Sequence, residues 1–297
     1  MSDINTQLEV RAQQYSAMIL PLAQQEKSLL LPTVFQRTGV TGKSFYQDQI
    51  GSWEMSAKTA PNADTPQNDP NLSRTRVDLA TYNDSRMLDR SLLLQELSDP
   101  ASMTNLNVAS AIGRKIDEII YGALGGTTMR GEQGTNIVSF PSANVIAADF
   151  EAAGTNTGLT VAKIQHAAKM LEDKAVRGEF WLVASATAKE QLLKDVKATS
   201  GDYTINKPMD SGVIRGFYGF NLVFLPAGII KKSGNVAEYF AYEKTGVVFG
   251  MPETLFLRVD ERQDKSYSKQ IYYEMTAGAG RLEEARVIKI LGDESVQ

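Results

Sequence analysis

The segment from Pro100 to Leu124 most constrains the fold, because its pattern predicts one uninterrupted amphipathic helix. Its apolar residues recur at i, i+4, i+7 and i+11 and form one stripe: Ile112, Ile116, Ile119 and Ala123. Its charged residues are expected on the remaining, solvated faces: Arg114, Lys115, Asp117 and Glu118. Asp99 is suited to cap the helix, Pro100 to its first turn and Gly125 to its end. At about 1.5 Å per residue the helix is about 37 Å long, so we expect it to act as a spine.

The composition excludes several kinds of functional site. The chain has 297 residues, with 31 Lys and Arg against 35 Asp and Glu, a single histidine (His166) and no cysteine. Without cysteine there is no disulfide, thiolate nucleophile or iron–sulfur cluster, and one histidine excludes a His-rich metal site. The net charge of −4 argues against a dedicated nucleic-acid binder, which normally carries a basic patch. A hydrophobic fraction of 42% supports a sizeable core, in two domains or one elaborate domain.

No segment predicts secretion or membrane insertion. The longest apolar run near the N-terminus, Ala17–Leu20, ends at Pro21 and follows acidic residues rather than a basic start. No stretch approaches the roughly 20 apolar residues of a transmembrane helix. We therefore expect a protein that is soluble in the cytoplasm where it is made.

The sequence of residues 36–90 predicts a long two-stranded hairpin that extends away from the body of the protein. Aromatic residues occur in Gly42–Lys58 with imperfect alternation, whereas Arg76–Tyr82 alternates clearly and predicts a strand. Between them, three prolines among Asn, Asp and Thr predict a mobile, solvated tip. An isolated hairpin is marginal in water, so this one is expected to need a neighbouring surface. Residues 1–35 predict a Gln-rich, weakly helical arm with little core of its own.

Residues 150–260 alternate helices and strands. One helix is predicted by the spacing of its apolar residues: Val161, Ile164, Ala168 and Leu171. A second helix is expected to begin at Thr187 and Glu190, which have capping-box spacing. Strands are predicted here and in the C-terminal segment within these ranges: 180–184, 220–225, 239–242, 255–259, 270–274 and 285–291.

No motif for catalysis or cofactor binding is present. The chain has no dinucleotide or phosphate-loop fingerprint, and the glycines of Gly212–Gly219 favour tight turns. His166 lacks a nucleophile and an orienting partner, which indicates an ordinary packed or surface residue. The adjacent pairs Asp117–Glu118 and Glu283–Glu284 do not face one another on a helix or strand, so we expect them on solvated faces. We predict no catalytic, cofactor-binding or metal-binding residues and no enzyme activity.

Several motifs carry, by their order along the chain, a resemblance to a known family. They are Ala111–Leu124, Leu159–Ile164 followed by Gly178–Ser185, Gly212–Val223 before Leu225–Pro226, and Gly278–Ile290. Their order and spacing resemble the major capsid protein of tailed bacteriophages, whose fold is called the Hong Kong 97 type. The likeness covers residues 35–291, nearly the whole chain.

The resemblance implies an α+β capsid fold with an N-terminal arm, an extended β-hairpin loop, a long spine helix, a peripheral domain and an α/β axial domain. The parts would be the arm at 1–35, the extended loop at 36–90, the peripheral domain at 91–149 and 255–297 with the spine helix at 100–124, and the axial domain at 150–254. The implied function is structural: self-assembly into the icosahedral head shell around the double-stranded DNA of a tailed phage.

The resemblance also implies partners. Many copies of the chain would form hexamers and pentamers, helped by a separate scaffolding protein and joined by a portal protein and a decoration protein. Packaged double-stranded DNA would make only weak, non-specific contact, and neither a membrane nor a cofactor is implied. The shell would assemble in the host cytoplasm and become part of the virion.

The resemblance places the extended loop across a neighbouring subunit. The loop residues expected at contacts between subunits are Phe45, Tyr46, Trp53, Arg74, Arg76 and Tyr82. Two lysines of the loop, Lys43 and Lys58, are expected to be solvated rather than to form a covalent crosslink.

Other interpretations stay open. An encapsulin-like compartment would have the same fold around enzyme cargo, although the proline-rich tip and the long arm favour a virus. An α/β enzyme would use residues 150–260 as its catalytic domain, but the chain lacks a nucleophile, cofactor or metal motif. A tail-tube or other virion protein would require the spine helix to be absent.

Overall fold

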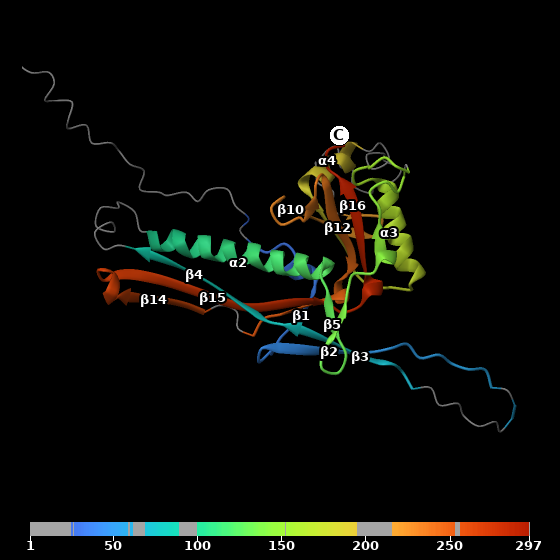
Figure 1. Cartoon of the computed structure of the whole chain (residues 1–297), viewed down its shortest axis with the longest axis horizontal. Coiled ribbons are helices and arrows are strands. Elements are labelled where there is room, and N and C mark those ends of the chain that lie inside the picture. Colours follow the sequence, from blue (N-terminus) through green and yellow to red (C-terminus); the bar gives the residue numbers. More distant parts are fainter. Residues whose placement is uncertain are drawn as a thin grey trace, which may run out of the picture.

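The computed structural model describes residues 25, 27–58, 60–61, 69–88, 100–151, 153–194, 216–252 and 256–296. Figure 1 shows the arrangement of these parts. A long helix lies along a long sheet, a compact lobe of helices and strands stands at one end, and a hairpin projects beyond that end. The predicted N-cap Asp99 and most of the arm lie outside the described residues.

The spine helix α2 spans Pro100–Gly125, one residue longer than predicted. Its buried face differs from the predicted stripe and is formed mainly by Ile116, Ile120, Tyr121 and Leu124, together with Asp117. The prediction that Asp117 is solvated is wrong, because this side chain is 0% exposed. Its carboxylate accepts hydrogen bonds from the backbone N–H groups of Leu29 (3.0 Å) and Leu30 (2.9 Å), which lie far away in sequence.

The helix packs on the long sheet, in which β15 (Ser268–Arg281) is the central strand. The other strands are β1 (Phe35–Arg37), β13 (Val247–Gly250), β14 (Phe256–Arg262) and β4 (Ala80–Leu88). Strand β15 pairs antiparallel with β13 near its end and with β14 and β4 along most of its length. The predicted strands at 255–259 and 270–274 are therefore present and are longer than expected.

A second sheet carries the hairpin, in the order β2 (Ser44–Ile50), β3 (Leu72–Asp78), β5 (Thr128–Arg130) and β6 (Asn136–Val138). The prediction of one strand over Arg76–Tyr82 is wrong. Strand β3 ends at Asp78, and β4 begins at Ala80 in the long sheet. Leu79 separates them, with its backbone N–H bonded to the carbonyl of Lys43 (3.0 Å). The hairpin is not isolated at its base, because β5 pairs with β3.

The lobe contains a seven-stranded sheet with two helices, α3 (Val161–Asp173) and α4 (Ala186–Lys194). Its strands are β7 (Val145–Ile146), β16 (Val287–Asp293), β12 (Val236–Glu243), β8 (Phe180–Ser185), β10 (Phe220–Leu225) and β9 (Gly216–Phe217), with β11 (Lys232–Ser233) beside β12. The predicted capping box of Thr187 and Glu190 is wrong, because Ser185 Oγ accepts the N–H of Ala188 (3.0 Å) and α4 begins at Ala186, one residue before Thr187.

The sheets group the chain differently from the sequence-based division. Strands β7 and β16, expected in the peripheral domain, belong to the sheet of the lobe, because β16 pairs with β12 over seven residues. Strand β13, expected in the axial domain, belongs to the long sheet. Short 3₁₀ turns lie at Leu31–Thr33, Ser142–Asn144, Lys244–Gly246, Gln263–Lys265 and Glu284–Arg286.

A lysine is buried inside the lobe. Lys163 of α3 is 0% exposed, and its ammonium group donates to the carbonyl oxygens of Ala148, Thr157, Gly158 and Leu291 at 2.8–3.0 Å. Burial lowers the pKa of Lys163 to about 8. The four carbonyl groups satisfy the buried cation, and they tie the loop before α3 to the end of β16.

Candidate inter-subunit surface

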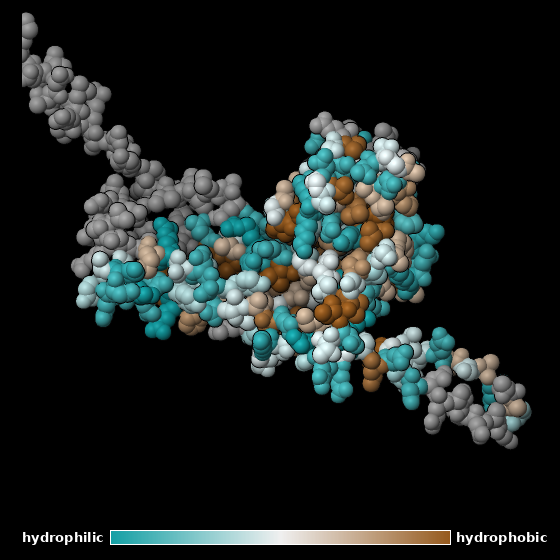
Figure 2. Space-filling model, in the orientation of Figure 1, coloured by the Kyte–Doolittle hydropathy of each residue, from teal (hydrophilic) through white to brown (hydrophobic). Residues whose placement is uncertain are grey.

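The projecting hairpin carries unusually exposed apolar side chains. Trp53 is 72% exposed and Met55 is 101% exposed, and Ile50 and Leu72 at the ends of β2 and β3 are also largely exposed. Figure 2 shows the described part of the hairpin standing clear of the body. A cluster of large exposed apolar residues is typical of a binding surface, because isolated soluble domains usually keep such clusters small.

Charged pairs stiffen the base of this hairpin. Arg74 donates two hydrogen bonds to the carboxylate of Asp48 (2.6 and 3.0 Å), and its guanidinium lies 5.7 Å from the ring centre of Tyr46. The hydrogen bond from Arg74 holds the pKa of Asp48 below its usual value. Arg76 makes a similar two-bond pair with Asp78. Both pairs are at the surface, so they orient the side chains more than they stabilise the fold.

The residues expected at subunit contacts divide into three groups. Tyr46, Trp53, Arg74 and Arg76 lie on the hairpin side of the molecule. Phe45 does not belong to the surface, because it is 5% exposed and packs against Val40, Val77, Val248 and Leu282 of its own chain. Tyr82 lies on β4 in a different sheet, beside α2.

Tyr82 lines a groove between α2 and β4, which we call the spine groove. It consists of two adjoining pockets of about 460 and 260 Å³ that share Tyr82 and Lys115. The residues that line the larger pocket are Thr81, Tyr82, Asn83, Asp84, Ala111, Ile112, Lys115, Tyr273 and Met275. The Lys115 ammonium lies 4.6 Å from the ring centre of Tyr82. Figure 1 shows that β4 and the projecting hairpin extend toward opposite ends of the molecule.

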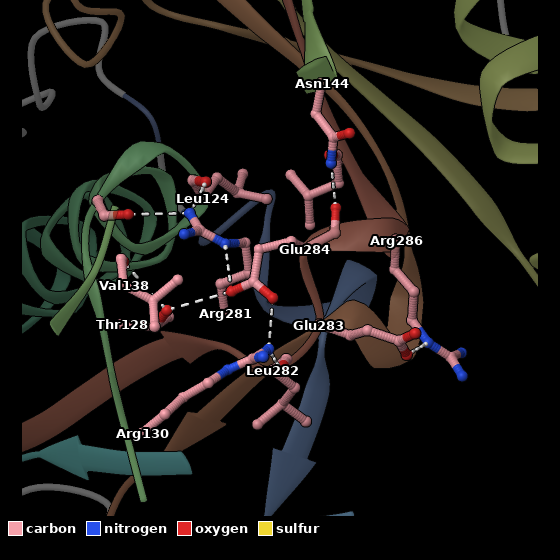
Figure 3. A network of polar contacts seen from close by, with 12 residues as sticks. Leu124, Thr128, Arg130, Val138, Asn144, Arg281, Leu282, Glu283, Glu284 and Arg286 are labelled. Carbon is pink, nitrogen blue, oxygen red and sulfur yellow. Dashed lines mark hydrogen bonds and ion pairs between the residues drawn. The ribbon is translucent and has the colours of Figure 1, made fainter. Parts of the chain in front are cut away.

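Glu284 joins the sheets and α2, a role that the sequence did not indicate. The pair Glu283–Glu284 was expected on a solvated face, but the Glu284 side chain is only 19% exposed. It contacts Arg130 of β5 at 2.5 Å and Arg281 of β15 at 3.9 Å (Figure 3). Arg281 in turn donates to the carbonyl of Leu124 at the end of α2 (3.0 Å). The hairpin sheet, the long sheet and the spine helix therefore meet at one carboxylate.

A second site that the sequence missed holds the end of the arm on the spine. Besides Leu29 and Leu30, the carboxylate of Asp117 accepts hydrogen bonds from Gln25 Nε2 and from Ser28 Oγ (2.6 Å). One turn earlier, Gly113 lets the backbone of Lys27 and Ser28 approach, since a Cβ atom there would lie 2.8 Å from Ser28 N. The only signal in the sequence is a glycine and an acid four residues apart on a helix.

The described ranges show no feature of a metal site or a membrane span. Within them, no group of three or more His, Asp or Glu side chains could hold a metal ion. No described helix is long and apolar enough to cross a membrane. His166, the sole histidine, stacks against Phe150 with ring centres 4.5 Å apart.

A spine helix on a long sheet, a compact α/β lobe and a projecting hairpin together define a capsid subunit of the Hong Kong 97 type. The chain belongs to the phage capsid protein family, whose model, described as "Phage capsid protein", matches residues 4–294. It is thus a structural protein, the major capsid protein of a phage, and not an enzyme. A comparison with curated protein sequences finds no match.

Solved capsid structures have the same fold. The capsid subunit of cyanophage Pam1 is 10% identical, with a TM-score of 0.74 over 100% of both chains. The capsid subunit of Helicobacter pylori bacteriophage KHP30 is 11% identical, with a TM-score of 0.74 over 99% of this chain and 98% of that one. That of Ralstonia phage GP4 is 12% identical, with a TM-score of 0.74 over 96% of this chain and 95% of that one.

The predicted fold class is confirmed. The presence of α2 argues against the tail-tube alternative, and the family does not favour a compartment shell or an enzyme.

Proposed function

We propose that copies of this chain assemble, as hexamers and pentamers, into an icosahedral head shell that encloses the double-stranded DNA of a tailed phage. The observation that carries the proposal is the projecting hairpin with Trp53 and Met55 exposed. Burying a large apolar side chain contributes about 1.5–3 kcal/mol, so leaving these residues in water forgoes stability that a neighbouring copy would supply. Contacts of this kind between copies in a head-to-tail arrangement close into rings and surfaces.

We assign roles to the parts by the sheets rather than by sequence alone. The seven-stranded lobe, including β7 and β16, would be the axial domain at the centre of a capsomer. The long sheet with α2, including β1 and β4, would be the peripheral domain. Within residues 36–90, the part between β1 and β4 would be the loop that crosses a neighbour, and the segment before residue 25 would be an exchanged arm. The contact residues on this proposal are Tyr46, Trp53, Arg74, Arg76 and Tyr82.

The proposal includes other partners that the family resemblance favours. They are a separate scaffolding protein, a portal protein and a decoration protein, with assembly in the host cytoplasm. DNA would touch the shell only weakly, because the chain carries a net charge of −4 and would attract a polyanion little.

The test is negative-stain electron microscopy of the expressed chain, fractionated by size, with and without a candidate scaffolding protein. Closed shells or capsomer rings are expected in at least one condition. A monomer or dimer under both conditions would contradict the proposal. Shells that co-purify with an enzyme instead of DNA when the chain is expressed beside its neighbouring genes would favour a compartment.

A further inference from the structure

Residues 51–58 have the pattern of a β-strand but form none within the chain. Beyond β2, the sequence Gly51–Lys58 alternates, with Trp53, Met55 and Ala57 on one side and polar residues on the other. Each of these residues is exposed, and the structure assigns them no strand. The alternation predicts a strand with one buried face. To form that strand, residues 51–58 need the edge of a sheet to pair with and an apolar surface beside it.

The spine groove offers such an edge. Among the described residues, β4 is paired on one side only, with β15. The side chains of Ala80, Tyr82 and Asp84 lie opposite Ala277, Met275 and Tyr273, and the pockets lie between this row and α2. The larger pocket also touches Thr81 and Asn83, which places it at the edge of β4. An unpaired edge of this kind is a template for an added strand.

We propose that residues 52–58 of one copy add to β4 of a second copy as an antiparallel strand, with Trp53 and Met55 in the spine groove. The inference rests on the proposed function, since it requires two copies in one assembly. The partner is a second copy because the hairpin points away from the groove of its own chain (Figure 1). The larger pocket, at about 460 Å³, lies in the range of about 300–1,000 Å³ that holds a small organic group such as an indole.

Length and pocket size indicate the direction of the added strand. From Trp53 to Lys58 an extended chain covers about 17 Å. The groove runs beside α2 from Ile112 to Gly122, about 15 Å. The larger pocket, of about 460 Å³, lies at the Ile112 end of the groove and suits the indole of Trp53. The smaller pocket, of about 260 Å³, lies at the Gly122 end and suits the smaller side chain of Ala57.

This direction sets a register. With Trp53 opposite Asp84, Met55 lies opposite Tyr82 and Ala57 opposite Ala80, all facing the groove. On the other face, Ser52 lies opposite Ser85. The Lys115 ammonium, already placed over the Tyr82 ring, would also face the incoming indole, an arrangement that favours a cation–π contact.

The test is a cysteine pair in a chain that has no cysteine of its own. Ser52→Cys with Ser85→Cys introduces near-isosteric groups at two exposed positions that the register places opposite one another. Opposite residues have Cα atoms about 4.5–5.5 Å apart, within the about 4.4–6.8 Å that a disulfide spans. The matched control is Ser56→Cys with Ser85→Cys, which the register separates by about 13 Å along the strand.

The particles are first inspected by electron microscopy, then oxidised and run on a non-reducing denaturing gel. The expected result is a ladder of linked chains from the Ser52→Cys, Ser85→Cys particles and monomers from the control. Intact particles without a ladder from the first pair would overturn the inference while leaving the proposed function standing. A ladder from the control pair alone would place the strand in another register and would also overturn it. Failure of the unsubstituted chain to form particles would contradict the proposed function itself.

Discussion

At the scale of single residues, two glycines of α2 provide a test of how the arm is held. A Cβ atom at Gly113 would lie 2.8 Å from the backbone of Ser28, whereas at Gly122 it would have no neighbour within 4 Å. We expect Gly113→Ala to destabilise the protein by about 1–3 kcal/mol, because the backbone on α2 must shift. The matched variant Gly122→Ala should stabilise it by up to about 1 kcal/mol through helix propensity. Chemical denaturation measures the free energy of unfolding of both variants. Equal effects would contradict the close contact between the backbone of Ser28 and Gly113 of α2.

A buried tyrosine should make stability fall in alkali. Burial raises the pKa of Tyr242, whose hydroxyl is hydrogen-bonded to Thr33 Oγ1 (2.6 Å). Above pH of about 10 the unfolded chain releases this proton and the folded chain keeps it, so the free energy of unfolding falls as pH rises. Tyr242→Phe should reduce that slope by about 1.4 kcal/mol per pH unit. Denaturation at a series of pH values above 10 measures it, and an unchanged slope would contradict the assignment.

At the scale of elements, the hairpin separates folding from assembly. Among the described residues, the outermost backbone hydrogen bond between the two strands of the hairpin runs from Gly51 N to Asn71 O (2.8 Å), and β2 and β3 pair on the body side of it. Replacing residues 52–70 with an Asn-Gly turn should leave a monomer of unchanged thermal stability, because the base of the hairpin pairs with β5. The same variant should lose shells in sedimentation and electron microscopy. Normal shells would refute the role assigned to the loop, and an unfolded monomer would show that the loop belongs to the core.

The elements that the sequence predicts well are those specified by local pattern. Helix α2, helix α3 and strands β8 and β10 follow from periodicity and turn residues over short windows. The wrong predictions concern residues whose burial or strand pairing depends on a part of the chain far away in sequence. Asp117 is buried because the hydrogen-bond donors to its carboxylate come from a segment that lies 87 to 92 positions before it in the sequence. The strand predicted over Arg76–Tyr82 is divided because its first half, in β3, pairs in the hairpin sheet and its second half, in β4, pairs in the long sheet. The local sequence pattern does not indicate this difference in pairing.

The candidate surface was predicted less completely than the fold. Trp53 and Arg74 stay predictions of contact residues, and both are exposed, as such a role requires. Phe45 was also predicted at a subunit contact, yet its ring lies in the chain's own core. Whether an aromatic residue of a half-buried strand faces inward or outward depends on register, which the imperfect alternation of this segment does not specify.

At the scale of the whole molecule, two tryptophans allow assembly to be followed in solution. Trp53 is exposed on the hairpin, whereas Trp181 lies half-buried in β8 of the lobe. If the hairpin docks on a second copy, tryptophan fluorescence should shift to shorter wavelength as shells form. Trp53→Phe should abolish the shift while Trp181→Phe retains it. A shift that persists in Trp53→Phe particles would show that the indole stays in water.

The spine helix also has a mechanical consequence. With 26 residues it is about 39 Å long, and it is clamped near its C-terminal end, where Arg281 bonds the carbonyl of Leu124. If α2 and the long sheet beneath it tilt together about this clamp by about 10°, the far end of the helix moves by about 7 Å. In the proposed shell of pentamers and hexamers, copies that differ only by such a small angle would meet either five or six neighbours. The curvature of a closed surface would then be set by rotation at one joint, without rebuilding the subunit.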